Sequence, residues 1–159
     1  MVRVDLQVDY AGATPSVHDF NRWAAAAVRS ERSSAELCIV VVDHTQGRDL
    51  NQRWRQRDYA TNVLAFPADL PPELNQPLLG DLVICAPVVI REAREQEKTV
   101  EAHWAHLTVH GTLHLLGYDH LDDASEQQME SLETDILSSL GFADPYQPSP
   151  HFDIVTDNA

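Results

Sequence analysis

The residues best suited to do chemistry in this chain are histidines gathered in one short segment. Five of the eight histidines among the 159 residues lie within eighteen positions, in the sequence HWAHLTVHGTLHLLGYDH. His110 and His114 are spaced i, i+4, so on a helix their imidazoles point toward one spot. Gly117 can end that helix and turn the chain back, which would bring His120 to the same spot. Three neutral ring nitrogens with an open fourth position are the ligands of a catalytic zinc ion.

Other polar residues flank this predicted metal site. His103 and His106 lie on a neighbouring arc of the same helix, and we expect them to support the ligands or to face a substrate, with plain packing as the alternative. Asp119 could approach the ion, although an aspartate beside a capping position more often caps a helix or accepts a hydrogen bond from a ligand. Zinc is the expected metal, one per chain, and three imidazoles also accept other divalent transition metals such as nickel, cobalt or copper.

The residue after the first ligand bears on the type of reaction. In zinc peptidases with the HExxH pattern, a glutamate at this position is the general base. This chain has Gly111 there, which disfavours peptide hydrolysis. A metal with an arginine nearby suits an anionic transition state at a phosphoryl group, because guanidinium neutralises the developing charge.

The charge distribution is unusual. The chain has 11 basic and 25 acidic residues, a formal net charge of −14, and no lysine or arginine after Lys98. Such a chain repels polyanions on average. Arg48, Arg53, Arg55 and Arg57 nevertheless fall within ten residues, so the sequence predicts a local basic strip on an acidic body.

The remaining composition indicates one globular domain. Apolar residues make up 43% of the chain, and the longest aliphatic run, Leu37 to Val42, is far below the roughly 18 residues of a membrane-spanning helix. The N-terminus lacks the apolar stretch of a signal peptide, so a cytoplasmic location is expected. With only Cys38 and Cys85, both in apolar runs, a disulfide framework is excluded.

Hydropathy periodicity predicts an α+β fold of the layered α/β kind, with a mixed, mostly four-stranded sheet packed by about five helices. The expected strands cover residues 2–8, 37–42, 62–66 and 78–85, and the expected helices run from Thr14 and Pro15 to about Ser33, from Thr45 to about Arg53, from Pro87 to Lys98, from Val100 to Leu116 and from Asp123 to Leu140. The metal site lies on the central helix and the turn after it. Residues 1–141 form the predicted domain, and residues 142–159 a loosely ordered tail.

Four segments resemble the YbeY family of bacterial endoribonucleases and ribosomal RNA maturation factors. They are the histidine segment and, in family order, WRQRDYATNVLAFP (54–67), LLGDLVIC (78–85) and MESLETDIL (129–137). The resemblance implies a cytoplasmic, zinc-dependent endoribonuclease directed at single-stranded RNA. It further implies a role in maturation of the 3′ end of small-subunit ribosomal RNA and in ribosome quality control. In the family, the residues at His110, His114 and His120 bind the metal.

The resemblance also assigns an arginine. The family pattern R-G-K-D-x-x-T-[DN]-V-L-S-F has its arginine at Arg55 and its lysine at Arg57. We therefore expect Arg55 to be catalytic and Arg57 to support the site or to face the substrate. Gln56 replaces the usual glycine, which affects the shape of the loop, and Ala65 replaces the usual serine, which removes a hydroxyl. The implied partners are single-stranded ribosomal RNA, the small ribosomal subunit and its associated factors.

Two alternatives stay open beside an endoribonuclease. One is a metal-dependent hydrolase of a peptide or another phosphoester that uses the same histidines. The other is a non-catalytic ribosome-assembly factor whose metal is structural and is held by four protein ligands.

Overall fold

The structure, a computed structural model, describes residues 1–29, 31–119 and 121–146. Over these ranges the elements are β1 (Val2–Val8), α1 (Val17–Val28), β2 (Ala35–Val42), α2 (His44–Arg55), β3 (Val63–Pro67), the 3₁₀ turn η1 (Pro72–Leu74), β4 (Leu78–Cys85), α3 (Ala86–Glu95), α4 (Val100–Leu115) and α5 (Asp123–Ser139). The predicted α+β class is confirmed. His120 and residues 147–159, which carry one predicted ligand and most of the predicted tail, lie outside the described residues.

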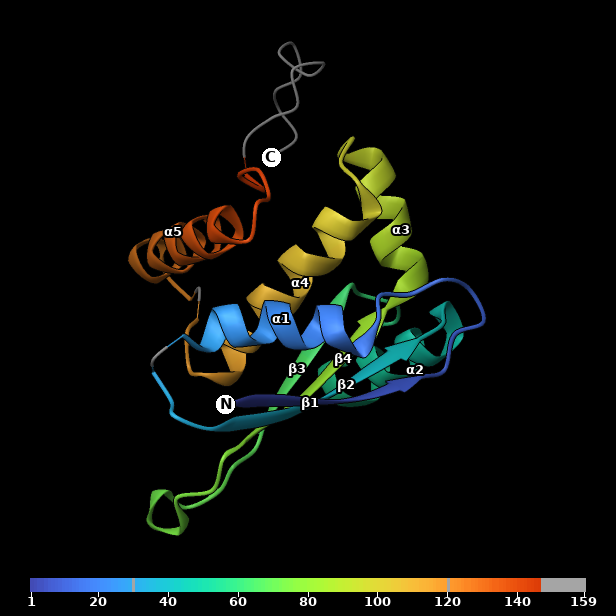
Figure 1. The fold of residues 1–159 in the computed structure, drawn as a ribbon. Coiled ribbons are helices and arrows are strands. Elements are labelled where there is room, and N and C mark those ends of the chain that lie inside the picture. The colour runs from blue at the N-terminus through green and yellow to red at the C-terminus, as the bar shows by residue number, and fades with distance from the viewer. Residues whose placement is uncertain (30, 120, 147–159) are drawn as a thin grey trace.

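The four strands form one mixed sheet in the order β1-β2-β4-β3. Strands β1, β2 and β4 run parallel, and β3 pairs antiparallel with β4 at the edge of the sheet. The connection between β3 and β4 carries η1 and extends away from the rest of the protein (Figure 1). Gly80 permits the close approach of β3 and β4, because a Cβ there would lie 2.2 Å from the Phe66 carbonyl oxygen.

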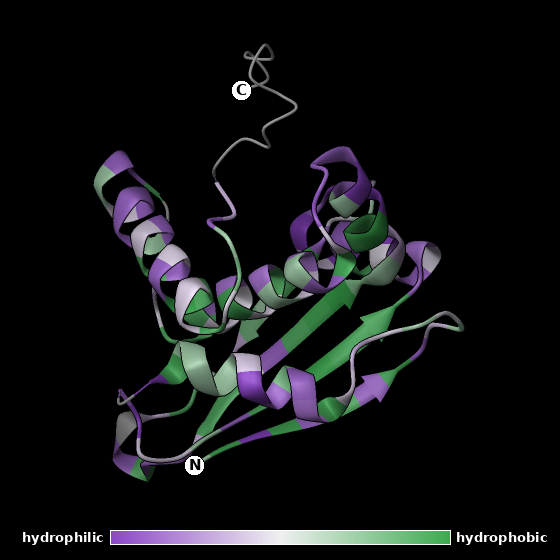
Figure 2. Ribbon diagram, turned by 45° about the horizontal axis from the view of Figure 1, so that its top comes forward, coloured by the Kyte–Doolittle hydropathy of each residue, from purple (hydrophilic) through white to green (hydrophobic). Residues whose placement is uncertain are grey.

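Helices cover both faces of the sheet. Helices α1 and α4 lie on one face, with α5 packed outside them, and α2 lies on the other (Figure 1). The central strands are mainly hydrophobic, whereas the helices also carry hydrophilic residues on their outer sides (Figure 2). This layering follows from burial on both faces of a largely parallel sheet.

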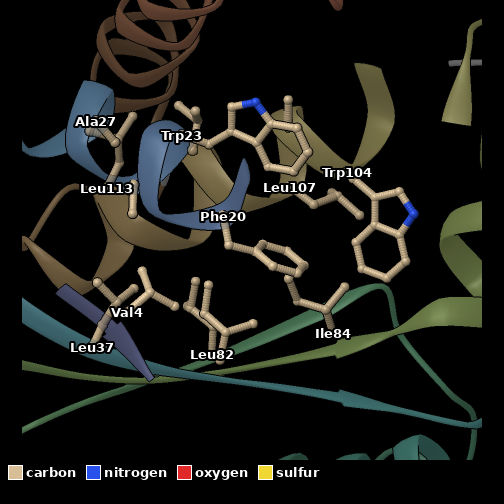
Figure 3. Packing of buried hydrophobic residues seen from close by; sticks show 14 of the residues in the cluster. Val4, Phe20, Trp23, Ala27, Leu37, Leu82, Ile84, Trp104, Leu107 and Leu113 are labelled. Carbon is tan, nitrogen blue, oxygen red and sulfur yellow. The ribbon is translucent and has the colours of Figure 1, made fainter. Parts of the chain in front are cut away.

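The main core lies between the sheet and helices α1 and α4 (Figure 3). Phe20 packs edge-on against Trp23 and Trp104, with ring centroids 5.7 and 5.8 Å away. Below these rings lie side chains of the strands, including Leu37 and Leu82, both essentially inaccessible to solvent. This core holds α4 against the sheet along most of its length.

Helix α4 is the central helix that the sequence predicts. Thr99 caps its N-terminus by accepting a hydrogen bond from the main-chain N–H of Ala102 at 3.1 Å. Gly117, with φ of +106°, ends the helix, and its N–H donates to the His114 carbonyl at 3.0 Å. The predicted termination at Gly117 is therefore confirmed, and the turn after α4 begins where a left-handed residue is required.

Several predicted helix boundaries are wrong by a few residues. Helix α1 starts after Ser16 rather than Thr14, because the Ser16 hydroxyl caps the N–H of Asp19 while Ser16 itself stays extended. The helix ends at Val28 rather than near Ser33, since Arg29 adopts a φ of +56°. These differences arise because the capping side chains, not the apolar periodicity, define a helix end.

The boundaries of α2 and α5 shift for the same reason. Asp43 rather than Thr45 caps α2 by accepting from the Gln46 N–H, and the helix continues to Arg55. In α5 the capping box uses Asp122 and Ser125, one residue before the predicted Asp123 and Glu126 pair. The apolar face of α5 and its end before Gly141 match the prediction.

The first residues after α5 return to the body of the protein. Phe142 packs against Trp23, with ring centroids 6.4 Å apart, and Tyr146 reaches Glu133 of α5. Residues 142–146 are thus attached to the domain. None of the described helices is long and apolar enough to cross a membrane.

Candidate metal centre

His110 and His114 form a close pair on α4. Their Nε2 atoms lie 3.1 Å apart, and their ring centroids lie 4.6 Å apart. Two nitrogens that each lie about 2.0–2.1 Å from one tetrahedral zinc ion are about 3.3 Å apart. The pair therefore has the spacing of two ligands of one ion, as their i, i+4 positions predict.

A buried carboxylate from another helix stands behind this pair. Glu133 of α5 has no exposed surface, and its Oε2 lies 2.8 Å from Nδ1 of His110. Its Oε1 lies 2.8 Å from Nε2 of His106 and 2.5 Å from the Tyr146 hydroxyl. Metal-ligating histidines usually donate their second N–H to such a carboxylate. The described residues thus supply two candidate ligands with this support, and no group of three that could hold a metal ion is found among them.

The surroundings determine the charge of this cluster. Burial raises the pKa of the Glu133 carboxyl, but the hydrogen bonds from His106, His110 and Tyr146 outweigh burial and lower it to about 2. Burial lowers the pKa of His106 more than the neighbouring Glu133 raises it. Burial and Glu133 together raise the pKa of Tyr146. At neutral pH the cluster therefore holds an anionic glutamate, a neutral His106 and a protonated tyrosine.

The cluster borders a cavity that can admit small molecules. The cavity has a volume of about 250 Å³. Its lining residues are His110, Glu126, Met129, Glu130, Glu133 and Tyr146. A side chain of the histidine pair is thus accessible from the cavity, although the carboxylate behind it is buried.

His103 belongs to a second group of hydrogen-bonded side chains, about one turn before His106 on α4. Its Nε2 lies 2.8 Å from Oε1 of Glu92 on α3, and Asn62 donates to the same oxygen at 3.0 Å. The main chain of Asn62 also accepts from the N–H of Cys85 at 3.0 Å. His103 therefore ties α4 to α3 and to the start of β3, which is a packing contact between elements.

Arg55 lies at the last residue of α2, not in a loop beyond it. Its Nη2 donates to the main-chain carbonyl of Ala65 on β3 at 3.0 Å, and its guanidinium lies 5.8 Å from the ring centre of Phe66. The side chain is exposed overall. Gln56 follows with φ of +60°, so it occupies the left-handed position for which the family's glycine is suited.

One of the four arginines in the predicted basic strip is paired with an aspartate. Arg48 pairs with Asp58 through two bonds, Nε to Oδ1 at 2.7 Å and Nη2 to Oδ2 at 3.1 Å. The side chains of Arg53 and Arg57 are exposed near the end of α2. Between them Trp54 is 61% exposed, so the surface combines guanidinium groups with an aromatic ring.

The structure also describes Asp119 and Gly111, two further residues on which the sequence analysis depends. Asp119 lies, exposed, in the turn after α4. Gly111 faces the sheet, where a Cβ would lie 2.8 Å from the Leu82 side chain. A glutamate at this position would enter the core, so the chain has no room for the HExxH arrangement there.

The histidines contact three residues that the sequence did not single out, namely Glu133, Glu92 and Tyr146. Glu133 had a detectable signal, because it is a charged residue within the apolar stripe formed by Met129 and Ile136 of α5. A charge at a core position requires a partner. Tyr146 and Glu92 had no comparable signal, since the partners of both come from other elements.

The fold and site together define a mixed-sheet α+β protein with a histidine-based candidate metal centre on its central helix. The family model described as "Endoribonuclease YbeY" matches residues 10–141. The chain is 56% identical over 160 residues to "Endoribonuclease YbeY" of Stutzerimonas stutzeri, covering 99% of this chain and 100% of the relative. A Cellvibrio japonicus protein of the same name is 49% identical, over 98% of this chain and 89% of its own. The chain therefore belongs to the endoribonuclease YbeY family.

A solved structure agrees on the fold. The solution structure of TM1509 from Thermotoga maritima covers 92% of this chain and 99% of its own, with a TM-score of 0.57 and 21% sequence identity. At this identity the similarity concerns the fold alone. It supports the α+β arrangement described above.

Proposed function

We propose that this protein is a zinc-dependent endoribonuclease that cuts single-stranded RNA in the cytoplasm. Its expected substrate is ribosomal RNA of the small subunit, at the 3′ end, during maturation and quality control of the ribosome. The observation that carries the proposal is the His110–His114 pair, with Nε2 atoms 3.1 Å apart and His110 bonded through Nδ1 to a buried glutamate. The pair occurs in a chain that belongs to an endoribonuclease family.

His110, His114 and His120 would hold the metal. A divalent ion bound there supplies Lewis-acid chemistry, which polarises a phosphoryl oxygen and activates water for attack. Three neutral imidazoles leave a net positive ion, and such a site favours an anionic substrate more than a thiolate or carboxylate site would. Asp119, next to His120 in sequence, would assist by accepting a hydrogen bond from a ligand.

Arg55 would neutralise charge on the scissile phosphate. Its guanidinium is exposed, and the bond to the Ala65 carbonyl uses one of its five N–H donors. The remaining donors suit bidentate binding of phosphate oxygens. Arg55 thus combines a defined position at β3 with free donor capacity.

The surface beside Arg55 would contact the flanking single strand. Arg53 and Arg57 supply phosphate contacts, and the exposed ring of Trp54 offers a face on which a base can stack. With Arg48 paired to Asp58, three arginines of the basic strip are left for RNA on this acidic chain. Tight binding to free RNA scales with such contacts, so delivery by the small subunit and its associated factors fits the charge distribution.

The two alternatives make different predictions. A peptidase of the HExxH type needs a glutamate where Gly111 packs against Leu82. A purely structural metal needs four protein ligands. The three-histidine set proposed here has one fewer.

The test is metal analysis of the purified protein combined with cleavage assays. We expect about one zinc per chain, cleavage of a single-stranded RNA, loss of cleavage with a chelator and recovery on adding zinc. A duplex RNA and casein serve as control substrates and should stay intact. Cleavage that persists in chelator, in protein shown to be metal-free, would contradict the proposal.

A further inference from the structure

Three side chains from two parts of the fold form hydrogen bonds with the one buried carboxylate of Glu133. His110 and His106 come from α4, and Tyr146 comes from the segment after α5. Their distances to the carboxylate oxygens are 2.8, 2.8 and 2.5 Å. An ionised carboxylate accepts hydrogen bonds and donates none. Each of the three partners must therefore present a hydrogen atom to Glu133.

This requirement determines the tautomer of His110. With its proton on Nδ1, bonded to Glu133, a neutral His110 ring has its lone pair on Nε2. That nitrogen faces Nε2 of His114 at 3.1 Å. The buried glutamate thus presents the correct nitrogen of His110 for metal binding, and the ring cannot rotate without breaking the bond.

The other two partners hold the carboxylate itself in place. His106 and Tyr146 both meet Oε1, leaving Oε2 for His110. Tyr146 also contacts His106, at 3.2 Å between its hydroxyl and Nε2. Asp144 accepts a hydrogen bond from the N–H of Tyr146 at 2.8 Å and one from the Thr134 hydroxyl of α5 at 3.3 Å, which attaches this segment to α5. The segment after α5 therefore closes the group beside His106 of α4.

We propose that Glu133 is a positioning residue for the metal ligand His110, and that Tyr146 and His106 lock Glu133 in the orientation this requires. The proposal rests on the proposed metal site. It adds to that site a set of supporting side chains, one of which, Tyr146, lies beyond α5. It excludes Glu133 from direct contact with RNA, since the carboxylate has no exposed surface.

The principal variant is Glu133→Gln, which keeps the size of the side chain. It replaces a carboxylate with two acceptor oxygens by an amide with one acceptor oxygen and one donor NH₂. An amide can accept from one ring and must turn its NH₂ toward another donor. We expect zinc affinity, measured by competition with a chromogenic chelator, to fall about 10- to 100-fold. We expect Tyr146→Phe to lower it by a smaller factor, because His106 still holds Oε1.

Glu126→Gln is the matched control. It removes the same charge from α5 and from the wall of the same cavity, but its side chain is exposed. We expect zinc affinity close to wild type. An equal loss in Glu126→Gln and Glu133→Gln would assign the effect to overall charge and would overturn the positioning role.

A readout on the metal-free protein separates this proposal from the proposed function. Nitrogen-15 NMR of the imidazoles should find the His110 proton on Nδ1 in wild type and shifted toward Nε2 in Glu133→Gln. If wild type binds no zinc but shows this tautomer change, the proposed function fails and the positioning role stands. A proton on Nε2 of His110 in wild type overturns the positioning role.

Cleavage of single-stranded RNA gives a third measurement. Because the defect lies in holding the ion, excess zinc should restore most of the turnover of Glu133→Gln, whereas a merely unfolded variant would not recover. Should Glu133→Gln fail to fold, Tyr146→Phe decides the question. If a folded Tyr146→Phe variant has wild-type zinc affinity and an unchanged His110 tautomer, Tyr146 does not hold Glu133 in place and this part of the proposal is overturned.

Discussion

Nη2 of Arg55 donates a hydrogen bond to the main-chain carbonyl of Ala65, 3.0 Å away. The bond joins the end of α2 to the edge strand β3. Since the acceptor is a main-chain atom, alanine in place of the family's serine leaves it intact. Two residues earlier on β3, Val63 packs against Gly111, which follows His110, a proposed metal ligand. Strand β3 is therefore a common support for the arginine and for the histidine pair.

The proposed role of Arg55 predicts that its removal lowers the rate of RNA cleavage but leaves the bound metal in place. We expect Arg55→Ala to lower turnover of single-stranded RNA by roughly 10²- to 10³-fold, the scale of losing one charged transition-state donor. Zinc content and melting temperature should stay close to wild type. Arg55→Lys should recover little, because a point charge does not reproduce bidentate phosphate contact. Near-full single-turnover cleavage by Arg55→Ala at saturating RNA would assign the arginine to docking.

Arg53→Ala is the control for Arg55. It removes a neighbouring exposed charge of the same helix, so it should weaken RNA binding modestly and flatten the salt dependence. Turnover at saturating RNA should change little.

His114 is predicted to be essential for metal retention. We expect His114→Ala to hold well below one zinc per chain after dialysis, measured by elemental analysis. The variant should also lose the rise in melting temperature that added zinc gives to wild type, since a bound ion stabilises the native state. Full zinc content in this variant would remove His114 from the site.

The packing of Gly111 predicts that an HExxH sequence cannot be built into this helix. We expect Gly111→Glu to lower the free energy of unfolding by about 3 kcal/mol or more, because a carboxylate would be buried against Leu82 without a partner. Urea denaturation measures the loss. Gly111→Ala should be milder, since the gain in helix propensity of about 1 kcal/mol partly offsets the crowding. A stable Gly111→Glu protein would show that this side of α4 can open.

Gln56 carries local backbone strain that glycine would relieve. Its φ of +60° and ψ of +35° are left-handed, which costs a side-chain-bearing residue about 1–2 kcal/mol, while glycine loses about 0.4–1 kcal/mol through the unfolded chain. We therefore expect Gln56→Gly to raise the free energy of unfolding by about 0.5–1 kcal/mol, measured by denaturant melts. Gln52→Gly, within α2, should instead lower it by about 1 kcal/mol.

The hydrogen bonds of the Glu92 carboxylate with His103 and Asn62 predict that the stability of the protein depends on pH. Burial raises the pKa of the Glu92 carboxyl, but hydrogen bonds from His103 and Asn62 outweigh burial and bring it below its usual value of 4.5. As the pH falls through 4.5, the unfolded chain takes up the proton first, so the contribution of Glu92 to stability is present above that pH and is lost below it.

Urea denaturation of Glu92→Gln at several pH values measures this contribution. At pH 7 the variant should be less stable by about 1.5–3 kcal/mol, the range for hydrogen bonds to a charged group. The difference from wild type should shrink as the pH falls below 4.5. Glu95→Gln, exposed on the same helix, should show no such trend, and a constant difference for Glu92→Gln would contradict the prediction.

The local features of this protein were predictable because they depend on neighbours in sequence. His110 and His114 face each other because they are four residues apart on one helix. Helix α4 ends where Gly117 allows a left-handed conformation. Strand β4 was predicted with its observed bounds, since an apolar run with β-forming residues needs no distant information. Helix starts were less accurate, because two nearby polar residues, such as Thr14 and Ser16, compete for the capping position.

The order of the strands required the tertiary structure. Every predicted strand is compatible with several neighbours, and the choice of β1-β2-β4-β3 depends on how the helices cover both faces. The contact of Arg55, at the end of α2, with the edge strand β3 follows from that order. A basic residue near a strand could be read from the sequence, but its contact with Ala65 could not.

The sequence by itself determined the α+β class, the central helix and the pair of imidazoles that faces one spot, because each depends on periodicity or on spacing within a single helix. Only the tertiary structure decided what stands behind that pair. His110 and Glu133 are 23 residues apart, and Tyr146 lies 13 residues beyond Glu133. They meet because α5 packs on α4 and the chain then returns across it. The charge of Glu133 is tolerated in the core only where these donors converge, which is a property of packing between elements and not of any one segment.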